Sequence, residues 1–336
     1  MKKTRLLDLL FHPFRISATR KLPDNPERIL VIRQDNRIGN LILITPFLKM
    51  CRELFPNSKI DVVVGGFFGE VIRNNPCINS LHIYNQLKFI RFPWLFLLFI
   101  FRLRRSRYNI VFDMKSDLSF NNIMLTLLCG AKFRIGFRNE ISKEYYDMTI
   151  PINYALYEAE ILTTLLTPWK PAGKTPSITY IPKKEAVEKA LKVLRNNNLP
   201  SGKTVGIHTG GRGAKRIALS DFLSLGQRLI ADQHPVIFFF GPDELSYMLQ
   251  FKEAGFICIC PKRVEDFGGF LPHMSHFISC DTGPMHMAAG AGVSTYSIFV
   301  NSSPERYAPR GDKHKIIRSV REINLTEIST QLGNAP

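Results

Sequence analysis

A short polar segment stands between an apolar run and an alanine-rich segment, and its residue types suit the binding of an anion. The run 276–280 is typical of a buried strand, and Pro284 opens a segment that we expect to be helical. The residues between them are Asp281, Thr282 and Gly283. Free amides and the helix dipole gather at a helix start capped by Asp or Thr, so a phosphate would bind well here. His286 falls in the first turn of the same helix. An ordinary capped turn explains the segment equally well, since helix starts of this kind are common.

A second turn of the same kind lies far upstream, after the β-branched run 27–33. Its loop contains Asp35, Arg37, Gly39 and Asn40. Gly39 lets the backbone turn tightly and approach a ligand closely. We expect Asn40 to cap a helix that runs to about Phe55, and Pro46 to kink or locally loosen that helix. The loop lacks the GxGxxG pattern, so the fingerprint of a dinucleotide site is absent.

Apolar runs of strand length alternate with helical patterns along the chain. The predicted strands cover 27–33, 59–64, 81–85, 109–114, 133–137, 204–211, 235–241, 256–260, 276–280, 294–299 and 314–319. The longer predicted helices cover 41–55, 92–107, 157–167, 184–196, 221–232 and 325–332. This alternation predicts an α/β protein whose parallel sheets have helices on both faces.

A stretch rich in Pro and Gly at 168–173 interrupts this pattern, which restarts after it. The sequence therefore predicts a basic leader at 1–27, a Rossmann-like domain at 28–167, a linker at 168–176 and a second Rossmann-like domain at 177–336. Two doubly wound domains joined in this way face a central cleft at the carboxyl ends of their sheets, where ligands bind.

The net charge of +17 indicates an anionic partner, such as nucleic acid, a phosphorylated substrate or an acidic membrane surface. No module that reads nucleic acid is evident, and general surface basicity is the simplest alternative. The six cysteines form neither a CxxC pair nor a His/Cys cluster, so the sequence indicates no zinc site and no disulfide framework. Free thiols fit a reducing cytosol. The basic leader is a poor signal peptide, because Asp8 interrupts its short apolar patch.

The predicted helix 92–107 is unusually apolar and aromatic, and arginines flank it. Its apolar part is far too short to span a bilayer. Two interpretations are equally favoured. The helix dips into an anionic membrane surface, or it is a core helix that covers the sheet and has an Arg-rich end.

Five segments, in this order, resemble glycosyltransferase family 9, the heptosyltransferases that build the lipopolysaccharide core. They are DNRIGNLILITP (35–46), GIHTGGRGAKR (206–216), FFGPDE (239–244), DTGPMHMAAGAG (281–292) and SPERYAP (303–309). The resemblance implies a GT-B fold in which the N-terminal domain binds a lipid-linked, anionic sugar acceptor and the C-terminal domain binds an ADP-activated heptose. It also implies inverting catalysis without metal or other cofactor. The expected place is the cytoplasm, peripheral on the inner face of the bacterial inner membrane, and nucleic acid is not an expected partner.

The resemblance also assigns roles to residues of the predicted C-terminal domain. Helix-start amides at 281–283 would contact the donor diphosphate, with His286 in the same pocket. Lys215 and Arg212 would neutralise phosphate charge, and the Gly pair before them would let the loop come close. A carboxylate of the next loop would bind nucleoside hydroxyls. The residues of these two loops are Gly210, Gly211, Arg212, Lys215, Asp243 and Glu244.

One position departs from the family, which usually has Gly-Asp where this chain has Gly39-Asn40. The family Asp is the expected base for the acceptor hydroxyl, and an amide cannot take up a proton at neutral pH. We therefore favour Asp35 as the base, although turn capping is nearly as good an explanation for this residue. Basic residues near the ends of N-domain strands would suit an acidic acceptor. The acceptor candidates are Arg37, Gly39, Arg134 and Arg138.

Two other functions are compatible with the same residues. A catalytically weak homologue would bind the sugar nucleotide without transferring the sugar, because of Asn40. A sugar-nucleotide epimerase is the second alternative, since two-domain folds of this kind also support that chemistry.

Overall fold

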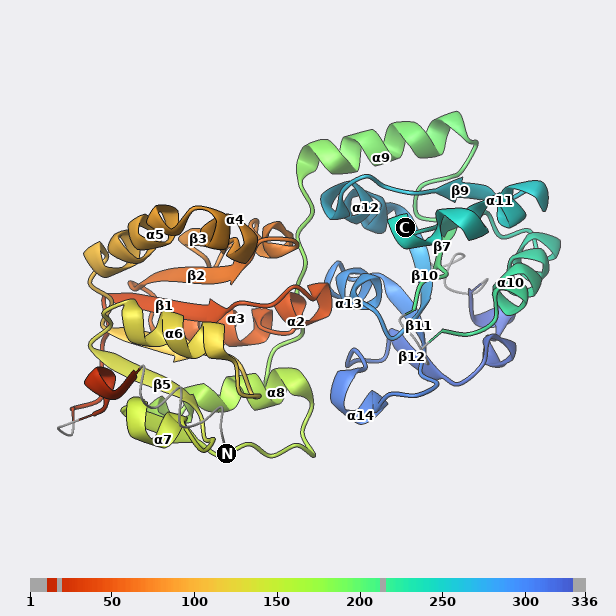
Figure 1. The fold of residues 1–336 in the computed structure, drawn as a ribbon. Coiled ribbons are helices and arrows are strands. Elements are labelled where there is room, and N and C mark those ends of the chain that lie inside the picture. Colours follow the sequence, from red (N-terminus) through yellow and green to blue (C-terminus); the bar gives the residue numbers. More distant parts are fainter. Residues whose placement is uncertain (1–10, 17–19, 212–215, 329–336) are drawn as a thin grey trace. The chain divides into compact units, whose positions relative to one another are not determined.

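The computed structural model describes residues 11–16, 20–211 and 216–328. The chain divides into two units, one formed by 1–37 and 43–176 and the other by 38–42 and 177–336. The boundary follows Pro176, the last residue of the predicted linker. Each unit contains a six-stranded sheet whose strands are all parallel (Figure 1). The α/β class predicted from the alternation is therefore confirmed.

The first sheet has the order β3-β2-β1-β4-β5-β6. Its strands are β1 (Arg28–Arg33), β2 (Lys59–Gly65), β3 (Ser80–Tyr84), β4 (Ile110–Asp113), β5 (Phe133–Phe137) and β6 (Met148–Ile150). The sequence did not predict β6, which has only three residues. The direction in which strands are added reverses between β1 and β4, and ligands of such sheets bind beyond the carboxyl ends at this point.

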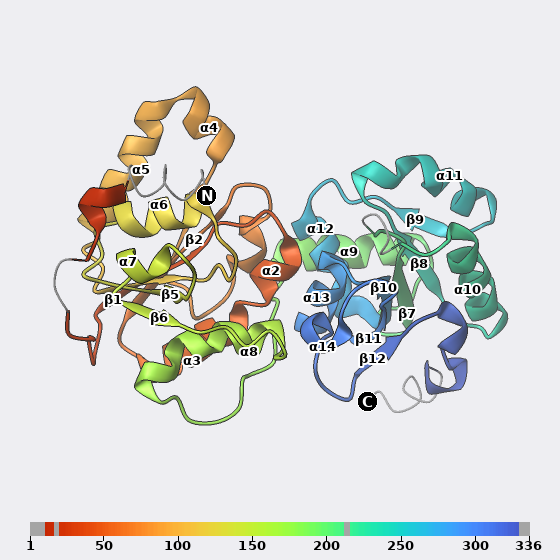
Figure 2. The same cartoon turned by 60° about the horizontal axis from the view of Figure 1, so that its bottom comes forward.

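Helices cover both faces of the first sheet. They are α3 (Thr45–Leu54), α4 (Gln86–Arg91), α5 (Pro93–Arg105), α6 (Phe120–Leu128), α7 (Ser142–Tyr145) and α8 (Glu158–Thr163). On one face, α5 and α6 bury Leu103 and Leu125 against strand residues such as Leu30. On the other, the ring of Phe47 in α3 lies 5.1 Å from the ring of Phe112 in β4. Figure 2 shows α4 and α5 together beyond α6.

The helix predicted after the first loop is two helices. α2 spans Ile38–Ile42 and α3 begins at Thr45, so Asn40 lies inside α2 and not at an N-cap position. Pro46 stands in the first turn of α3, where its missing N–H has no cost, so it opens a helix instead of kinking one. The expectation for Asn40 as a cap was wrong. The helix is interrupted at residues 43–44, just before Pro46, so the local loosening expected near Pro46 is present and a kink is not.

The described part of the leader packs against the first unit. Phe11 is buried in a cluster with Ile123 and Tyr145. The indole Nε1 of Trp169 donates a hydrogen bond to the carbonyl of Pro23 at 3.0 Å. The burial of Phe11 and the hydrogen bond from Trp169 therefore hold these leader residues in place, and the sequence had indicated no contact for them.

The second sheet repeats the topology of the first, with the order β12-β11-β10-β7-β8-β9. Its strands are β7 (Thr204–His208), β8 (Val236–Phe239), β9 (Ile257–Ile259), β10 (Met274–Cys280), β11 (Ser294–Ile298) and β12 (His314–Ile317). The reversal point lies between β7 and β10. Its helices are α2, α9 (Lys184–Asn196), α10 (Leu219–Ala231), α11 (Leu245–Glu253), α12 (Val264–Phe270), α13 (Gly283–Gly290) and α14 (Pro304–Tyr307).

The core of the second unit is aromatic. The ring of Phe238 in β8 packs against the rings of Phe251 in α11 and Phe256, with centroids 4.8 Å and 4.9 Å away. α10 contributes Leu225 and Leu229 to the same cluster. Truncating one such Phe to Ala would cost about 3–5 kcal/mol of stability. This core supports β7 and β8, whose carboxyl ends carry the candidate donor residues.

Candidate functional site

The carboxyl ends of β7 and β10 lie at the reversal point of the second sheet and are followed by the two most conspicuous motifs of the chain. Gly210 and Gly211 come after β7, and residues 281–283 come after β10. The two strands pair in parallel, with Ser279 opposite His208. The structure therefore brings the glycine pair and the predicted helix start to one edge of one sheet.

The helix start after β10 differs from the prediction in one respect. α13 begins at Gly283, and Thr282 occupies the N-cap position, but its side chain makes no capping hydrogen bond. Its Oγ1 is buried and has no hydrogen-bond partner among the described residues. The neighbouring Asp281 donates its backbone N–H to the carbonyl of Ile298 at 3.1 Å. The Thr282 hydroxyl therefore remains available to a ligand at the helix start.

Two further buried hydroxyls without a hydrogen-bond partner in the described part of the chain follow neighbouring strands. Thr209 stands directly after β7, and Ser302 lies in the loop after β11. Since β11, β10 and β7 are adjacent, their carboxyl ends meet at the same edge, where Thr282 also lies. Burying a hydroxyl without a partner costs about 1–3 kcal/mol, so three such hydroxyls make this edge a candidate site for a polar ligand.

The predicted carboxylates after β8 have different environments. Asp243 is exposed, whereas Glu244 is buried. One oxygen of Glu244 accepts a hydrogen bond from the guanidinium of Arg216 at 3.1 Å, and the other accepts one from the backbone N–H of Gly241 at 2.9 Å. Arg216 also stacks on Tyr247, with Cζ 5.2 Å from the ring centroid. Glu244 thus shapes the loop, and Asp243 is the carboxylate that faces solvent.

His208, the last residue of β7, contacts this loop. The backbone N–H of Gly210 donates to Nδ1 of His208 at 3.2 Å. A Cβ on Gly210 would lie 2.5 Å from Oε1 of Glu244, so only glycine fits between the two side chains. Burial lowers the pKa of His208, against the Glu244 carboxylate, which raises it. The imidazole is therefore neutral near pH 7 and accepts the Gly210 hydrogen bond.

The short helix α2 clusters with the second unit although the chain on either side of it belongs to the first. A Cβ on Gly39 would lie 2.7 Å from the ring of buried His286, and one on Gly283 would lie 2.6 Å from Cβ of Ile38. Glycine is required at both positions because the two helices approach so closely. Gly39 and Asn40, expected near an acceptor and a base, thus lie on a helix that packs against α13.

Asp35 follows β1 and takes part in an ionic cluster at the reversal point of the first sheet. Its Oδ2 accepts a hydrogen bond from Nζ of Lys115 at 3.3 Å, and Nη2 of Arg33 lies 3.7 Å from the same oxygen. Arg33 also lies 4.0 Å from Oε1 of Glu158. The side chain of Asp35 is only 6% exposed. The cluster holds this carboxylate in place at the edge where a ligand of the sheet is expected.

Asp113 ends β4 beside this cluster and is fully enclosed. Its oxygens accept hydrogen bonds from the hydroxyl of Tyr146 and the amide of Asn122, both at 2.6 Å, and from the backbone N–H of Lys115 at 3.0 Å. Burial raises the pKa of Asp113, against these hydrogen bonds, which lower it. The arrangement fixes the turn that carries Lys115 toward Asp35.

The predicted acceptor arginines separate into two groups. Arg37 and Arg138 are exposed and follow β1 and β5 at their carboxyl ends. Arg134 lies near the amino end of β5 and is buried, and its guanidinium donates to the carbonyls of Phe14 and Tyr145 at 3.0 Å and 3.1 Å. Because its charged group binds backbone inside the first unit, Arg134 is disfavoured as an acceptor residue. Arg212 and Lys215 lie outside the described residues.

Sequence reasoning missed several residues that the structure places at these edges. Lys115, His208 and Thr209 each stand at or just after a strand end, and this position is the signal that would have identified them. Arg216 lies shortly before α10 and carries no such signal. Lys115 is 80 residues from Asp35 in the chain, so no local pattern connects the two.

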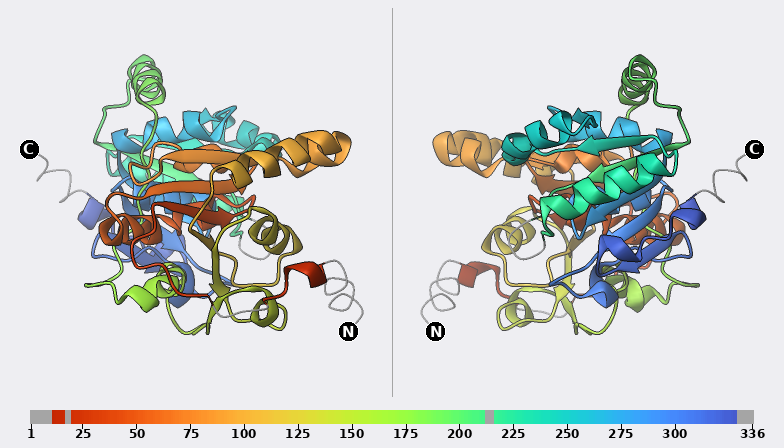
Figure 3. Two further views of the ribbon diagram at one scale, coloured as in Figure 1. Left: turned by 90° about the vertical axis from the view of Figure 1, so that its left-hand side faces the viewer. Right: turned by 90° about the vertical axis from the view of Figure 1, so that its right-hand side faces the viewer.

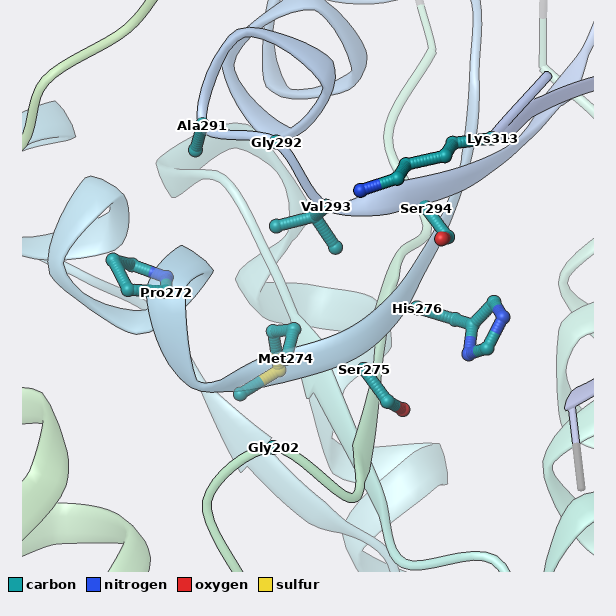
Figure 4. A pocket seen from close by; sticks show the side chains of 10 residues that line it. All are labelled: Gly202, Pro272, Met274, Ser275, His276, Ala291, Gly292, Val293, Ser294 and Lys313. Atoms are coloured by element: carbon teal, nitrogen blue, oxygen red, sulfur yellow. The ribbon is translucent and has the colours of Figure 1, made fainter. Parts of the chain in front are cut away.

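A cavity of about 510 Å³ lies at the opposite edge of the second sheet. Figure 4 shows Met274 and Ser294 at the amino ends of β10 and β11, with Lys313 above them. Because ligands of parallel sheets bind at the carboxyl ends, this cavity is distinct from the candidate donor edge. Among the described residues, no group of three His, Cys, Asp or Glu side chains is arranged to hold a metal ion, and no helix is long and apolar enough to cross a membrane.

Comparison with known proteins accounts for this geometry. Residues 97–332 match the family model of glycosyltransferase family 9 (heptosyltransferase). Lipopolysaccharide heptosyltransferase 1 of Campylobacter coli is 23% identical over 323 residues, which cover 89% of this chain and 92% of that protein. A family 9 glycosyl transferase from Veillonella parvula has a similar fold, with a TM-score of 0.80 and 17% identity, over 95% of this chain and 100% of that chain. E. coli ADP-heptose LPS heptosyltransferase II has a similar fold, with a TM-score of 0.74 and 17% identity, over 91% of this chain and 97% of that chain. Since the family model covers most of the chain, and both sheets have the expected doubly wound topology, this protein is a glycosyltransferase of family 9, the heptosyltransferases, with the GT-B fold.

Proposed function

We propose that this protein transfers a heptose from an ADP-heptose donor to the lipopolysaccharide core or a similar anionic glycolipid, with inversion at the anomeric carbon. The acceptor hydroxyl loses its proton to a base, and its oxygen bonds to the anomeric carbon. The bond from that carbon to the phosphate oxygen breaks, and ADP leaves with the electron pair. The protein must therefore bind a diphosphate and hold a base.

The observation that carries the donor assignment is a set of buried hydroxyls at one sheet edge, those of Thr209, Thr282 and Ser302, which have no hydrogen-bond partner among the described residues. A diphosphate offers many acceptor oxygens, and these hydroxyls and the first amides of α13 are donors that suit them. The names of two relatives, which are lipopolysaccharide heptosyltransferases, support this donor and acceptor class. The exposed carboxylate of Asp243 is our candidate for the nucleoside hydroxyls.

Asp35 is our candidate for the base. A carboxylate accepts a proton at neutral pH, and the amide of Asn40 cannot. Asp35 is held by Lys115 and Arg33 at the reversal point of the first sheet. Lys115 is a positioning residue in this proposal, because its contact is with the carboxylate.

We propose that the reaction needs no metal or other cofactor. The helix-start amides and hydroxyls stabilise the charge that develops on the departing diphosphate. Full activity in excess EDTA would support this, and recovery only after addition of Mg²⁺ would contradict it.

The proposed acceptor is membrane-borne, and the protein acts in the cytoplasm on the inner leaflet. Arg37 and Arg138 are exposed at the carboxyl edge of the first sheet and suit the acidic groups of such an acceptor. The net charge of +17 favours the same surface.

A transfer assay with ADP-heptose and lipopolysaccharide-core acceptors tests the proposal. Wild type should transfer heptose, and Asp35→Asn should lower kcat by about 10²–10⁴-fold, the usual contribution of a general base. Asp117→Asn is the matched control, because Asp117 contacts the same Lys115 at 3.6 Å but is 76% exposed. Equal losses in both variants would remove Asp35 as the base.

One observation favours a second candidate function. The position at which the family carries a base is Asn40, so the chain is also compatible with a binding protein that does not transfer sugar. Calorimetric binding of ADP-heptose by wild type without turnover, together with activity gained by Asn40→Asp, would favour that function over the enzyme.

A further inference from the structure

Helices α4 and α5 expose an apolar surface that no described part of the chain covers. Leu87 and Ile90 of α4 are 70% and 69% exposed, and Leu97 and Phe101 of α5 are 67% and 63% exposed. Trp94 and Leu98 belong to the same surface, which we call the α4–α5 surface. On α5 the residues Trp94, Leu97, Leu98 and Phe101 follow the i, i+3, i+4, i+7 spacing of one helix face.

The opposite face of α5 is already packed. Ile100 and Leu103 are buried against the first sheet, and Phe96 and Phe99 pack beside them. One face of this helix is thus part of the core, as the second interpretation expects, and the other face is exposed. A helix that is apolar all round is normally buried on all sides, so the α4–α5 surface lacks a partner.

The charge around this surface has one sign. No Asp or Glu occurs between Val71 and Phe112. The same stretch carries Arg73, Lys88, Arg91, Arg102, Arg104, Arg105 and Arg107. Most of these residues are in α4, in α5 or directly after it, and those between Lys88 and Arg107 are exposed. An apolar surface with a cationic border fits the headgroup region of an anionic bilayer.

A second copy of this chain is a poorer occupant. In a two-fold symmetric contact the same surface meets itself, so the arginines of one copy would face those of the other without any acid from this stretch between them. A bilayer supplies hydrocarbon and negative charge together. With 13 residues, α5 is about 20 Å long, which suits a helix lying in the membrane plane.

We propose that the α4–α5 surface docks the protein on an anionic lipid bilayer, with Trp94, Leu97, Leu98 and Phe101 inserted and the arginines on the headgroups. Figures 2 and 3 show both helices, in orange to gold, at the periphery of the first unit. The inference deepens the proposed function and rests on it only for the acceptor, since docking would keep the first unit beside a membrane-borne glycolipid.

Vesicle co-sedimentation tests the proposal. Wild type should bind vesicles containing phosphatidylglycerol and should not bind pure phosphatidylcholine vesicles. Leu97→Ser/Phe101→Ser should lower binding at least tenfold, because it removes two large apolar side chains from the inserted face. The matched control is Ile230→Ser/Leu249→Ser, which removes two exposed apolar residues from the second unit and should bind like wild type. Equal binding by all three proteins would overturn the proposal.

Two further experiments test the contact of the arginines with the headgroups and the insertion of Trp94 into the bilayer. Arg102→Glu/Arg105→Glu should abolish binding to the anionic vesicles, and 0.5 M salt should weaken wild-type binding. Vesicles of brominated lipid should quench the fluorescence of wild type more than that of Trp94→Phe, since Trp94 and Trp169 are the only tryptophans. Quenching that is the same in both proteins would show that the surface does not enter the bilayer.

Two results identify other causes. If wild type is a dimer without vesicles and Leu97→Ser/Phe101→Ser is a monomer, the surface is an interface between copies and the proposal fails. Heptose transfer to a lipid-free oligosaccharide acceptor should be unchanged in the surface variants. Its absence in wild type, with vesicle binding intact, would remove the proposed function and leave the docking surface standing.

Discussion

The two sheets share one topology, yet the carboxyl edges at their reversal points carry different kinds of residue. In the first unit the edge holds charged side chains that bind one another, with Asp35 between Lys115 and Arg33, and Asp113 enclosed by Tyr146 and Asn122. In the second unit the corresponding strands, β7 and β10, are followed by small residues and by hydroxyls without described partners. The first edge is thus dominated by paired charges, although Nε of Arg33 and Oδ1 of Asn122 lack described partners, and the second by small residues and hydroxyls.

This difference is informative about chemistry. A carboxylate that is to accept a proton must be held in one orientation, and ion pairs from neighbouring elements achieve that. A site for a diphosphate instead needs donors that the protein leaves unused until the ligand arrives. If this interpretation is right, substitutions at the first edge cost stability and those at the second cost affinity.

The largest effect on stability should come from Glu244, the exception in the second unit, because it is buried and paired. Glu244→Ala should lower the free energy of unfolding by about 2–4 kcal/mol, since it strands Arg216 and removes the acceptor for the Gly241 N–H. Its neighbour Asp243 is exposed, so Asp243→Ala should change stability by less than about 0.5 kcal/mol. Urea denaturation of both variants measures the contrast, and equal losses would contradict it.

At the first edge, Tyr146→Phe should destabilise the protein by about 1–3 kcal/mol. The substitution removes a hydroxyl that donates to the buried carboxylate of Asp113 and leaves the ring in place. Donor affinity, measured by calorimetry with ADP, should not change, because Tyr146 belongs to the first unit. A Tyr146→Phe variant that is as stable as wild type but binds ADP more weakly would contradict the expectation that the first edge contributes to stability and not to donor affinity.

At the second edge, Thr209→Val and Thr282→Val should have the opposite signature. Each removes a buried hydroxyl that has no described partner, so stability should stay the same or rise by up to about 1 kcal/mol. Affinity for ADP should fall about five- to tenfold in each, the equivalent of one lost hydrogen bond. The binding of adenosine, which lacks phosphates, is the control and should stay unchanged. Loss of stability without loss of ADP affinity would show that the hydroxyls are structural.

The smallest effect should appear in the pH dependence of stability. The folded pKa of His208 lies below its unfolded value near 6.5, so the unfolded chain binds more protons as the pH falls below that value. Stability should therefore decrease toward pH 5, with this residue contributing a slope of at most about 1.4 kcal/mol per pH unit. His208→Gln should lose that part of the slope in denaturation at pH 7.5, 6.5 and 5.5. A slope identical to that of wild type would show that His208 is readily protonated in the folded protein.

Much of the fold was predictable because its signals are local. The bounds predicted for α9, 184–196, agree with the structure, and every predicted strand is present. The helical periodicity and the apolar runs that carry this information extend over only a few residues. β6 was missed, and the break between α2 and α3 was expected only as a kink or a local loosening near Pro46. A three-residue strand carries almost no pattern. A proline is compatible both with a kink inside a helix and with the first turn of a new helix, so Pro46 alone could not show which of the two forms.

The candidate site was predictable only in part. The motif at 281–283 was visible, because a strand followed by a capped helix start is a local signal. The absence of a capping bond at Thr282, the internal use of Arg134 and the pairing of Asp35 with Lys115 were not visible. Each depends on groups that the fold brings together from distant parts of the chain.

The sequence by itself determined the alternation of strands and helices, the strand-to-helix turns with their small and polar residues, and the family to which they belong. These features depend on residue type and spacing, which the chain carries before it folds. The tertiary structure decided which of the charged and polar residues remain available. Strand order determines which groups lie next to Asp35 and Glu244. Packing against the first sheet determines which face of the apolar helix α5 is buried in the core. Whether a buried polar group is free to bind a ligand depends on the neighbours that surround it in the folded protein, because those neighbours supply or withhold its hydrogen-bond partners.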